Sequence, residues 1–378
     1  MKQGWEIKKL GEVCETSSGG TPSKTHKEYY EGGNIPWLRS GEVSQGLIYD
    51  TELYITAEGL DNSSAKIFPI DTVVIAMYGA TVGQVGVLKN AMSTNQAVCG
   101  IFPTPKFAPL FLVYYLKAKK SYFLSLAAGG AQPNISQQII RDTYISIPPR
   151  EEQEKIVEEM DCLSGVIEKK REQLRELDAL AQSIFFQMFG DPITNEKGWE
   201  VNIIGNLAEF YNGVAHEGSI SEDGQYDVIN SKFISTQGEI RKHCDSQIFP
   251  LIKNDIVMVM SDVPNGKALA KCYLIETSDK YTLNQRICAF RNYNCFKPIF
   301  LYYYLNRHPY YLRFDDGNGQ TNLRKNDVLN CPVYIPPLAL QQEFADKIEA
   351  IEKQKELIKK SISEVEDLFN SRMSYYFN

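Results

Sequence analysis

Several features that would assign this chain of 378 residues to a class of protein are absent. No apolar run approaches the roughly 20 residues that a membrane-spanning helix needs, and the opening "MKQGWEIKKLGEV" contains no apolar signal core. The eight cysteines form no C-x-x-C pair and the four histidines form no H-E-x-x-H cluster, so we expect no metal site. We therefore expect a cytoplasmic protein with reduced cysteines and no membrane association.

Motifs of catalysis are missing as well. An amino-methyltransferase that acts on DNA holds its flipped base with an N/D-P-P-Y/F loop, but the Pro-Pro pairs of this chain follow Ile147 and Ile335. The glycine-rich "GATVGQVG" (79–86) lacks the Gly-Lys-Ser/Thr ending of a phosphate-binding loop. We expect a non-catalytic chain that holds no cofactor itself.

The chain contains a repeat of its own sequence. "GWEIKKLGEV" (4–13) returns as "GWEVNIIGNL" (198–207), and "PLFLVYYL" (109–116) returns as "PIFLYYYL" (298–305). Asn95–Gln96 and "IPP" recur in the same order, and the matches end together at the last residue. Collinear matches of this kind predict two copies of one unit, residues 1–190 and 191–378.

Each copy divides into a globular part and a long helix. The globular parts, 1–148 and 191–336, contain short apolar runs between turn signals, which is typical of buried strands. The segments 109–126 and 298–314 are predicted to be helices that begin with proline. Residues 150–188 and 338–377 contain no proline, which predicts two long helices at 149–190 and 337–378. The fold class is therefore α+β with a tandem repeat.

Apolar residues in the long helices recur on a heptad, as in a coiled coil. The predicted seam consists of Ile156, Met160, Leu163, Ile167, Leu174, Leu177, Ile348, Ile351, Ile358, Ile362 and Val365. Lys170 and Lys355 also occupy seam positions, where a polar residue can fix the register. Two like copies in tandem pair most simply about a two-fold axis, which makes the helices antiparallel.

Two similar domains at the ends of a helical rod would match a protein that binds two DNA half-sites related by a two-fold axis. At about 1.5 Å per residue each helix is roughly 55–60 Å long, enough to hold two domains a DNA turn or more apart.

In its motifs and their order, the sequence resembles the specificity subunits of type I restriction–modification systems. The resemblance is carried by "SGGTPSK" (18–24), "IPWLRSGEV" (35–43), "YGATVGQVGV" (78–87), "STNQAVCGI" (93–101), "GGAQPNIS" (129–136), "IPPREEQEKI" (147–156) and "QMFGDPITNEKGWE" (187–200). It covers the whole chain in the family's order of recognition domain, helix, recognition domain, helix. The second domain departs from the pattern, since "EFYNGVAHEG" (209–218) and "SDVPNGKALAK" (261–271) replace the first and third motifs.

The resemblance implies a fold, a function and partners. Each recognition domain would read one half of a bipartite, asymmetric target in double-stranded DNA, and the antiparallel helices would set the spacing. Two methyltransferase (modification) subunits would bring S-adenosylmethionine, and restriction/translocase subunits would use ATP and Mg²⁺. The divergence between the two halves suits domains that read different sequences.

Polar side chains in the motif loops are the candidates for contacts with DNA bases. Those of the first domain are Thr21, Ser23, Lys24, Arg39, Ser40, Tyr78, Thr81, Gln84, Gln132 and Asn134. Those of the second are Asn230, Ser231, Lys232, Ser261, Asn265, Lys267, Gln320, Asn322, Arg324 and Lys325. Arg39, Lys232 and Lys267 have no counterpart in the other half, which favours a role in specificity, whereas the shared Asn-Gln pairs favour a structural role.

The net charge of −7 and pI of about 5.4 are unusual for a DNA-binding protein. Most of the excess negative charge lies on the two long helices, and the globular domains are nearly neutral. We therefore hypothesise that the isolated chain binds DNA weakly and binds tightly only with modification subunits.

Two other interpretations stay open. The chain could be the specificity polypeptide of a restriction system whose partner fuses methyltransferase and nuclease, or a coiled-coil scaffold that binds no DNA. Aromatic residues gather at the helix ends: Phe185, Phe186, Phe189, Tyr375, Tyr376 and Phe377. Packing beneath the neighbouring domain is the favoured explanation for them, and docking of a partner subunit is the alternative.

Overall fold

The computed structural model describes residues 5–127, 133–216 and 218–377. It divides into two compact units, Met1–Lys170 with Ser361–Asn378 (unit 1) and Arg171–Lys360 (unit 2). The units therefore cut both long helices. Each contains one globular domain, part of the helix that follows it and part of the other helix.

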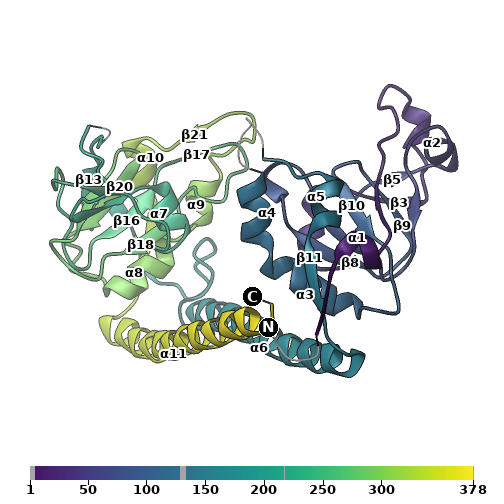
Figure 1. The fold of residues 1–378 in the computed structure, drawn as a ribbon. Helices are drawn as coiled ribbons and strands as arrows, with labels where there is room; N and C mark the ends of the chain where they lie inside the picture. Colours follow the sequence, from purple (N-terminus) through teal and green to yellow (C-terminus); the bar gives the residue numbers. More distant parts are fainter. Residues whose placement is uncertain (1–4, 128–132, 217, 378) are drawn as a thin grey trace. The chain divides into compact units, whose positions relative to one another are not determined.

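Unit 1 is built around a five-stranded sheet with the order β2-β10-β7-β8-β4. Figure 1 labels β8 and β10 of this sheet. Its strands are β2 (Thr16–Ser18), β10 (Val98–Ile101), β7 (Val73–Ala76), β8 (Val85–Leu88) and β4 (Leu47–Ile48). A four-stranded sheet has the order β5-β3-β9-β6, comprising Tyr54–Ile55, Ile35–Leu38, Met92–Thr94 and Ile67–Phe68. β1 (Glu6–Lys9) pairs with β11 (Tyr144–Ile147). The central strands β7, β8 and β10 are buried along their whole length, which explains why their sequences are continuous apolar runs.

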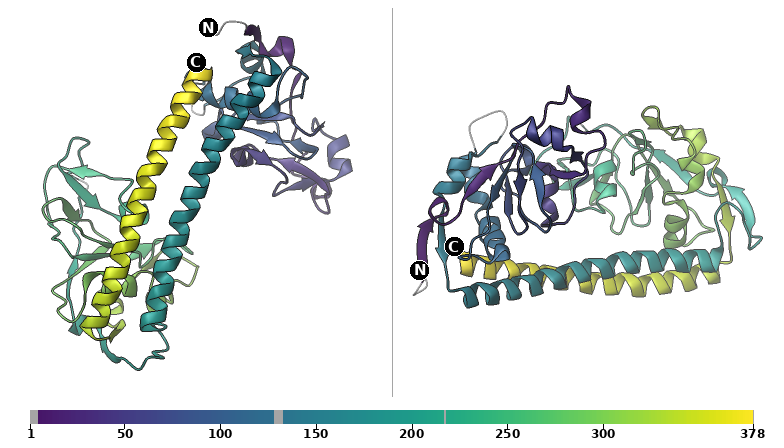
Figure 2. Two further views of the ribbon diagram at one scale, coloured as in Figure 1. Left: turned by 90° about the horizontal axis from the view of Figure 1, so that it is seen from below. Right: turned by 90° about the vertical axis from the view of Figure 1, so that its right-hand side faces the viewer.

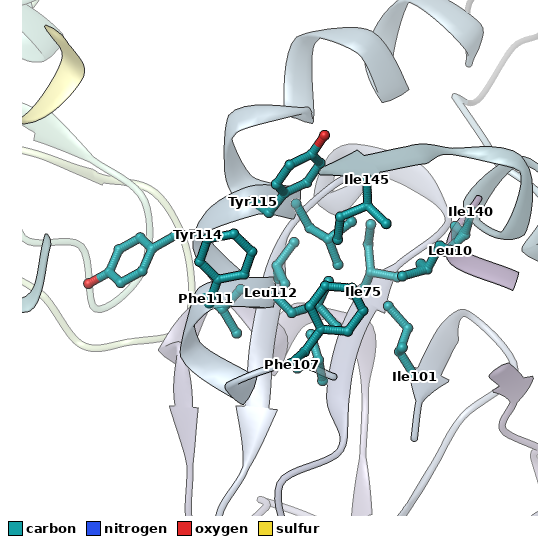
Figure 3. Packing of buried hydrophobic residues seen from close by; sticks show 14 of the residues in the cluster. Leu10, Ile75, Ile101, Phe107, Phe111, Leu112, Tyr114, Tyr115, Ile140 and Ile145 are labelled. Atoms are coloured by element: carbon teal, nitrogen blue, oxygen red, sulfur yellow. The ribbon is translucent and has the colours of Figure 1, made fainter. Parts of the chain in front are cut away.

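Helices cover the central sheet of unit 1 and close its core. They are α1 (Leu10–Val13), α3 (Pro109–Ala118), α4 (Lys120–Leu126) and α5 (Gln137–Asp142), while α2 (Ala57–Asp61) lies beside the other sheet. Phe111 and Leu112 of α3 pack among apolar side chains of the sheet (Figure 3). Tyr114 points away from this cluster and its hydroxyl donates to Asp161 at 2.6 Å, which ties α3 to the long helix.

Unit 2 repeats the strand order of unit 1. Its four-stranded sheet has the order β13-β20-β16-β18, comprising Glu209–Asn212, Ile287–Arg291, Ile256–Val259 and Cys272–Leu274. β14 (Tyr226–Ile229) and β19 (Tyr281–Leu283) pair in parallel, as β3 and β9 do. The remaining strands are β15 (His243–Cys244), β12 (Glu200–Ile203) with β22 (Pro332–Ile335), and β17 (Ser261–Asp262) with β21 (Thr321–Asn322). The tandem α+β repeat predicted from the sequence is therefore confirmed in the topology.

The helices within the globular domain of unit 2 are short. They are α7 (Ser231–Ser235), α8 (Pro298–Leu305), α9 (Pro309–Leu312) and α10 (Lys325–Leu329). The continuous helices predicted at 109–126 and 298–314 are each broken in two. The first is interrupted at Lys119, whose ψ of 7° is not helical. The second ends at Leu305, because Asn306 is extended with a ψ of 110° and Arg307 has a φ of +56°.

His308, at the start of α9, is buried and gives unit 2 a dependence on pH. Its Nδ1 accepts the backbone N–H of Tyr310 at 3.1 Å, and burial lowers its pKa from 6.5 to about 4. The unfolded chain binds a proton at about pH 6.5 and the folded chain does not, so the free energy of unfolding falls as the pH drops through the window from 6.5 to 4.

We expect this group to lower the free energy of unfolding of unit 2 by about 2 kcal/mol between pH 7 and pH 5. The control is His308→Asn, which keeps a side-chain acceptor for the helix start and removes the titration. Denaturant unfolding of both proteins at the two pH values measures the effect. An equal loss in both proteins would show that other groups cause it.

The long helices are α6 (Arg150–Phe189) and α11 (Leu338–Phe377). In each unit a segment of α6 lies beside a segment of α11 that runs in the opposite direction (Figure 2). In unit 1 Glu159 accepts hydrogen bonds from Arg372 and Tyr376, and in unit 2 Lys355 pairs with Asp178 at 2.8 Å. All of the predicted seam residues are buried or half-buried.

One buried glutamine in each unit anchors a helix to its globular domain. Gln153 accepts from the Ala108 N–H at 2.8 Å and donates to the carbonyls of Lys106 and Pro148. Gln341 makes the same bonds in unit 2, to the backbone of Lys297, Cys295 and Pro336. Since these partners are backbone groups, the anchor does not depend on the side chains of the domain.

The helix ends are part of the two cores. Phe185 and Phe189 pack on Phe300 of unit 2, and Phe377 packs on Phe111 of unit 1. These contacts agree with packing beneath a neighbouring domain. The side chains of Phe186 and Tyr375 are 42% and 60% exposed, so the packing explanation does not extend to them.

Candidate DNA-recognition surface

Five chain segments meet at one end of the unit 1 sheets. Ile135 N–H donates to Met77 O at 2.9 Å, Met77 N–H to Ala97 O at 2.8 Å and Gly19 N–H to Val98 O at 3.1 Å, while Asn95 N–H donates to Leu38 O at 2.9 Å. We call residues 19–21, 38–40, 77–79, 95–98 and 133–135 the unit 1 edge. The candidates Thr21, Arg39, Ser40, Tyr78 and Asn134 all lie on it.

Side-chain and backbone contacts join the segments of the unit 1 edge. Thr21 donates to the amide oxygen of Gln96, and Tyr78, 44% exposed, lies opposite Asn134 in an isolated β-bridge. A Cβ added at Gly19 would lie 2.1 Å from Thr94 Oγ1, so only glycine permits this approach.

Arg39 lies on the edge but is occupied. Its guanidinium bonds Glu42, at 3.4 Å, and Glu52, and Glu42 also accepts the backbone N–H of Arg39 at 3.0 Å. A contact of Arg39 with DNA would have to compete with two carboxylates. Its role in specificity stays a prediction.

The other candidates of unit 1 lie beside the edge. Ser23 and Lys24 are exposed in the loop after it, and the Thr81 hydroxyl donates to Tyr78 O at 3.0 Å in the next turn. Gln84 is half-buried, and its Oε1 has no hydrogen-bond partner among the residues that the structure describes. Gln132 lies outside the described residues.

Unit 2 has the same edge. Leu323 N–H donates to Met260 O at 2.8 Å, Met260 N–H to Arg286 O at 2.9 Å, Gly213 N–H to Ile287 O at 3.0 Å and Asn284 N–H to Ile229 O at 3.2 Å. Residues 213–215, 229–231, 260–262, 284–287 and 321–323 form the unit 2 edge. Asn230 and Ser231 thus occupy the place of Arg39 and Ser40, and Asn230 caps α7 through a bond to Phe233 N–H at 2.9 Å.

Three polar side chains at the unit 2 edge form a connected set. The Ser261 hydroxyl accepts from Gln320 Nε2 at 2.8 Å and donates to Asn322 Oδ1 at 2.7 Å. Gln320 and Asn322 border a cavity of about 590 Å³ that Phe314 and Arg324 also line. Fixed amide donors and acceptors beside an open cavity can recognise the edge of a nucleobase.

A tight loop beside this set presents Asn265 and Lys267. The Asp262 carboxylate accepts the N–H groups of Ala268 and Leu269 at 2.6 and 3.0 Å, and a Cβ at Gly266 would lie 2.1 Å from Asp262 Oδ2. The loop is therefore held from inside, and Asn265 and Lys267 are exposed on it.

The unit 2 edge is the more basic of the two. Five exposed cations lie on or next to it: Lys232, Lys267, Arg286, Arg324 and Lys325. The Lys325 ammonium lies 5.7 Å from the ring centroid of Phe210, and the backbone N–H of Arg324 is capped by Asp327 at 2.8 Å. Positive charge of this kind favours contact with phosphate or with guanine.

Sequence reasoning did not select three side chains of these edges. Gln96 and Gln285 belong to the shared Asn-Gln pairs, and Arg286 follows the second pair where Ala97 follows the first. The available signal was the change from alanine to arginine immediately after a repeated motif.

Two kinds of feature are absent from the described parts of the chain. Within residues 5–127, 133–216 and 218–377, no group of three His, Cys, Asp or Glu residues is placed to hold a metal ion. No helix in the same ranges is long and apolar enough to cross a membrane.

The chain matches one family twice. The family is described as the type I restriction modification DNA specificity domain, and the matches cover residues 2–178 and 196–367. Among curated proteins, the MjaIX type I restriction enzyme specificity subunit of Methanocaldococcus jannaschii is 30% identical over 229 residues, which is 55% of this chain and 52% of that protein. The chain spans between 40% and 52% of the length of the curated relatives that it matches at 29–31% identity.

Solved structures share the fold. A chain from a study of complex assembly and conformational transition of a type I restriction–modification system aligns with a TM-score of 0.61 at 18% identity, covering 100% of this chain and 98% of that one. The S subunit of a type I restriction–modification system from M. genitalium aligns with a TM-score of 0.54 at 15% identity, covering 99% and 97%. At these identities the likeness shows the fold.

Proposed function

Because this chain belongs to the type I restriction–modification DNA specificity family, we propose that it selects the DNA sequence on which such a complex acts. The observation that carries the proposal is the presence of two edges with one backbone frame and different side chains. The frame includes the same glycine and Asn-Gln pair in both units, whereas Ala97 is replaced by Arg286 and Tyr78 by Ser261. Two unlike readers on one chain suit a bipartite, asymmetric target.

Each edge reads one half-site, through the amide, hydroxyl and basic side chains that line it. The antiparallel helices fix the spacing between the half-sites, since their polar seam contacts, such as Lys355 with Asp178, select one register.

The chemistry belongs to other subunits. The chain supplies recognition to two modification subunits that carry S-adenosylmethionine, and to restriction subunits that use ATP and Mg²⁺. Because its net charge is −7, the isolated chain binds the phosphates of DNA weakly, and tight binding requires the modification subunits. Nanomolar, sequence-specific binding by the purified chain would contradict this part of the proposal.

Methylation-sensitive sequencing of a strain with and without this chain tests the function. We expect a bipartite, asymmetric methylated motif that disappears when the chain is removed and returns when it is restored. An unchanged methylation pattern would favour a scaffold that reads no DNA. A motif lost together with a single fused methyltransferase–nuclease partner would favour the other class of restriction system.

A further inference from the structure

Arg286 lies in the middle of the unit 2 edge. Its carbonyl accepts the Met260 N–H at 2.9 Å, and the preceding Gln285 donates its N–H to Val214 O at 2.9 Å. The residue therefore lies between the strand that leads to Ser261 and the segment that carries Gly213. Its side chain is exposed.

The backbone of Arg286 is in an unusual conformation. Its φ is +69°, in the left-handed region that disfavours any residue with a Cβ. Non-glycine residues in this region concentrate at ligand-binding sites, where the surrounding structure holds them. Here the bonds from Met260 and to Val214 hold the segment on both sides.

The guanidinium of Arg286 has no partner within residues 5–127, 133–216 and 218–377. Two other arginines of unit 2 are engaged, since Arg291 pairs with Asp255 at 2.7 Å and Arg241 with Asp227 at 3.1 Å. The nearby Asp262 carboxylate is occupied by backbone N–H groups of its own loop. All of the hydrogen-bonding capacity of the Arg286 fork is thus available to a ligand.

The corresponding position in unit 1 carries a different kind of side chain. Ala97 stands where Arg286 does, as the common hydrogen bonds from Met77 and Met260 show. In unit 1 the Thr21 hydroxyl bonds Gln96 beside this position, whereas unit 2 has Ala215 in place of Thr21. The side chain at this point of the edge is therefore specific to one unit, as a residue that reads sequence must be.

We propose that Arg286 reads a guanine in the half-site of unit 2, through two N–H groups donated to O6 and N7 in the major groove. A planar guanidinium matches these two acceptors, and this is the commonest specific contact between proteins and DNA. The inference rests on the proposed function. It adds the identity of one base of the half-site and of the residue that recognises it.

The test compares methylated motifs in cells that contain the partner subunits and one variant of this chain. Arg286→Asn removes the fork but tolerates the left-handed backbone. Arg286→Lys keeps the charge and loses the fork. The matched control is Arg307→Ala, because Arg307 also has a positive φ, of 56°, but lies outside the edge.

We expect Arg286→Asn and Arg286→Lys to reduce the preference for one G·C pair by roughly 10–100-fold, all other positions being unchanged. Arg307→Ala should leave the motif as it is. Uniform weakening at every sequence, or retention of the preference in Arg286→Lys, would show a phosphate contact and overturn the proposal. So would a unit 2 half-site without any G·C pair. Absence of a motif with the unaltered chain would instead contradict the proposed function.

Discussion

Replacing residues 1–148 with the corresponding domain of another member of the family is expected to change one half of the methylated motif and to leave the other half and the spacing unchanged. The reason is that the hydrogen bonds that build the unit 1 edge join residues of this range only. Methylation of the original sequence should fall by at least roughly 10³-fold, the usual gap between specific and non-specific binding.

The anchor between domain and helix makes the exchange feasible. Gln153 holds the domain through the backbone of Lys106, Ala108 and Pro148, so a donor domain can supply these groups provided that it has no proline at the position of Ala108. The donor does need aromatic side chains at the positions of Phe111 and Tyr115, which pack on Phe377 at 5.5 and 5.7 Å between ring centroids.

Exchange of residues 191–336 is the reciprocal control and should change the other half only. If either exchange alters both halves, the assignment of one domain to one half-site is wrong. Thermal unfolding of each chimera separates a change of specificity from loss of the fold.

The large elements could be predicted because each has a local or periodic signature. Pro148–Pro149 precedes α6, which begins at Arg150, and the predicted seam positions of both helices are buried or half-buried. Gly213 was placed in the segment that departs from the first motif, and the need for glycine there is visible only in the tertiary structure, since a Cβ at Gly213 would lie 1.8 Å from Asn284 O.

The candidate site was only partly predictable, because exposure and pairing depend on residues that are distant in the sequence. Arg39 was selected because it has no counterpart in the second half, yet Glu42 and Glu52 bind its guanidinium. Arg286 was not selected, since neither its positive φ nor its lack of a partner among the described residues is visible in one sequence. The helix-end aromatics could not be divided into buried and exposed members for the same reason, because the division depends on which domain each helix end meets.

Phe344→Ala is expected to destabilise unit 2 by about 3–5 kcal/mol, the usual cost of emptying a buried phenylalanine site. Phe344, near the start of α11, is fully buried. Its ring lies 5.6 Å from Phe185 and 5.4 Å from Phe189, both at the end of α6, and 5.3 Å from Tyr303 of α8. The substitution therefore removes the side chain where two antiparallel helices and the second domain meet. A loss of this size is a large part of the 5–15 kcal/mol that folding usually provides.

The control for Phe344→Ala is Leu357→Ala, on the same helix with a side chain that is 69% exposed. It should change stability by less than about 0.5 kcal/mol. Denaturant unfolding gives the size of the effect, and hydrogen exchange gives its place. We expect faster exchange in β16 and α8 of unit 2 and unchanged exchange in β7 and α3 of unit 1, because the cavity opens only among side chains of unit 2. Equal acceleration in both units would mean that the long helices couple the two cores so tightly that they unfold as one, and a loss below about 1 kcal/mol would mean that α11 does not depend on this aromatic cluster for its attachment.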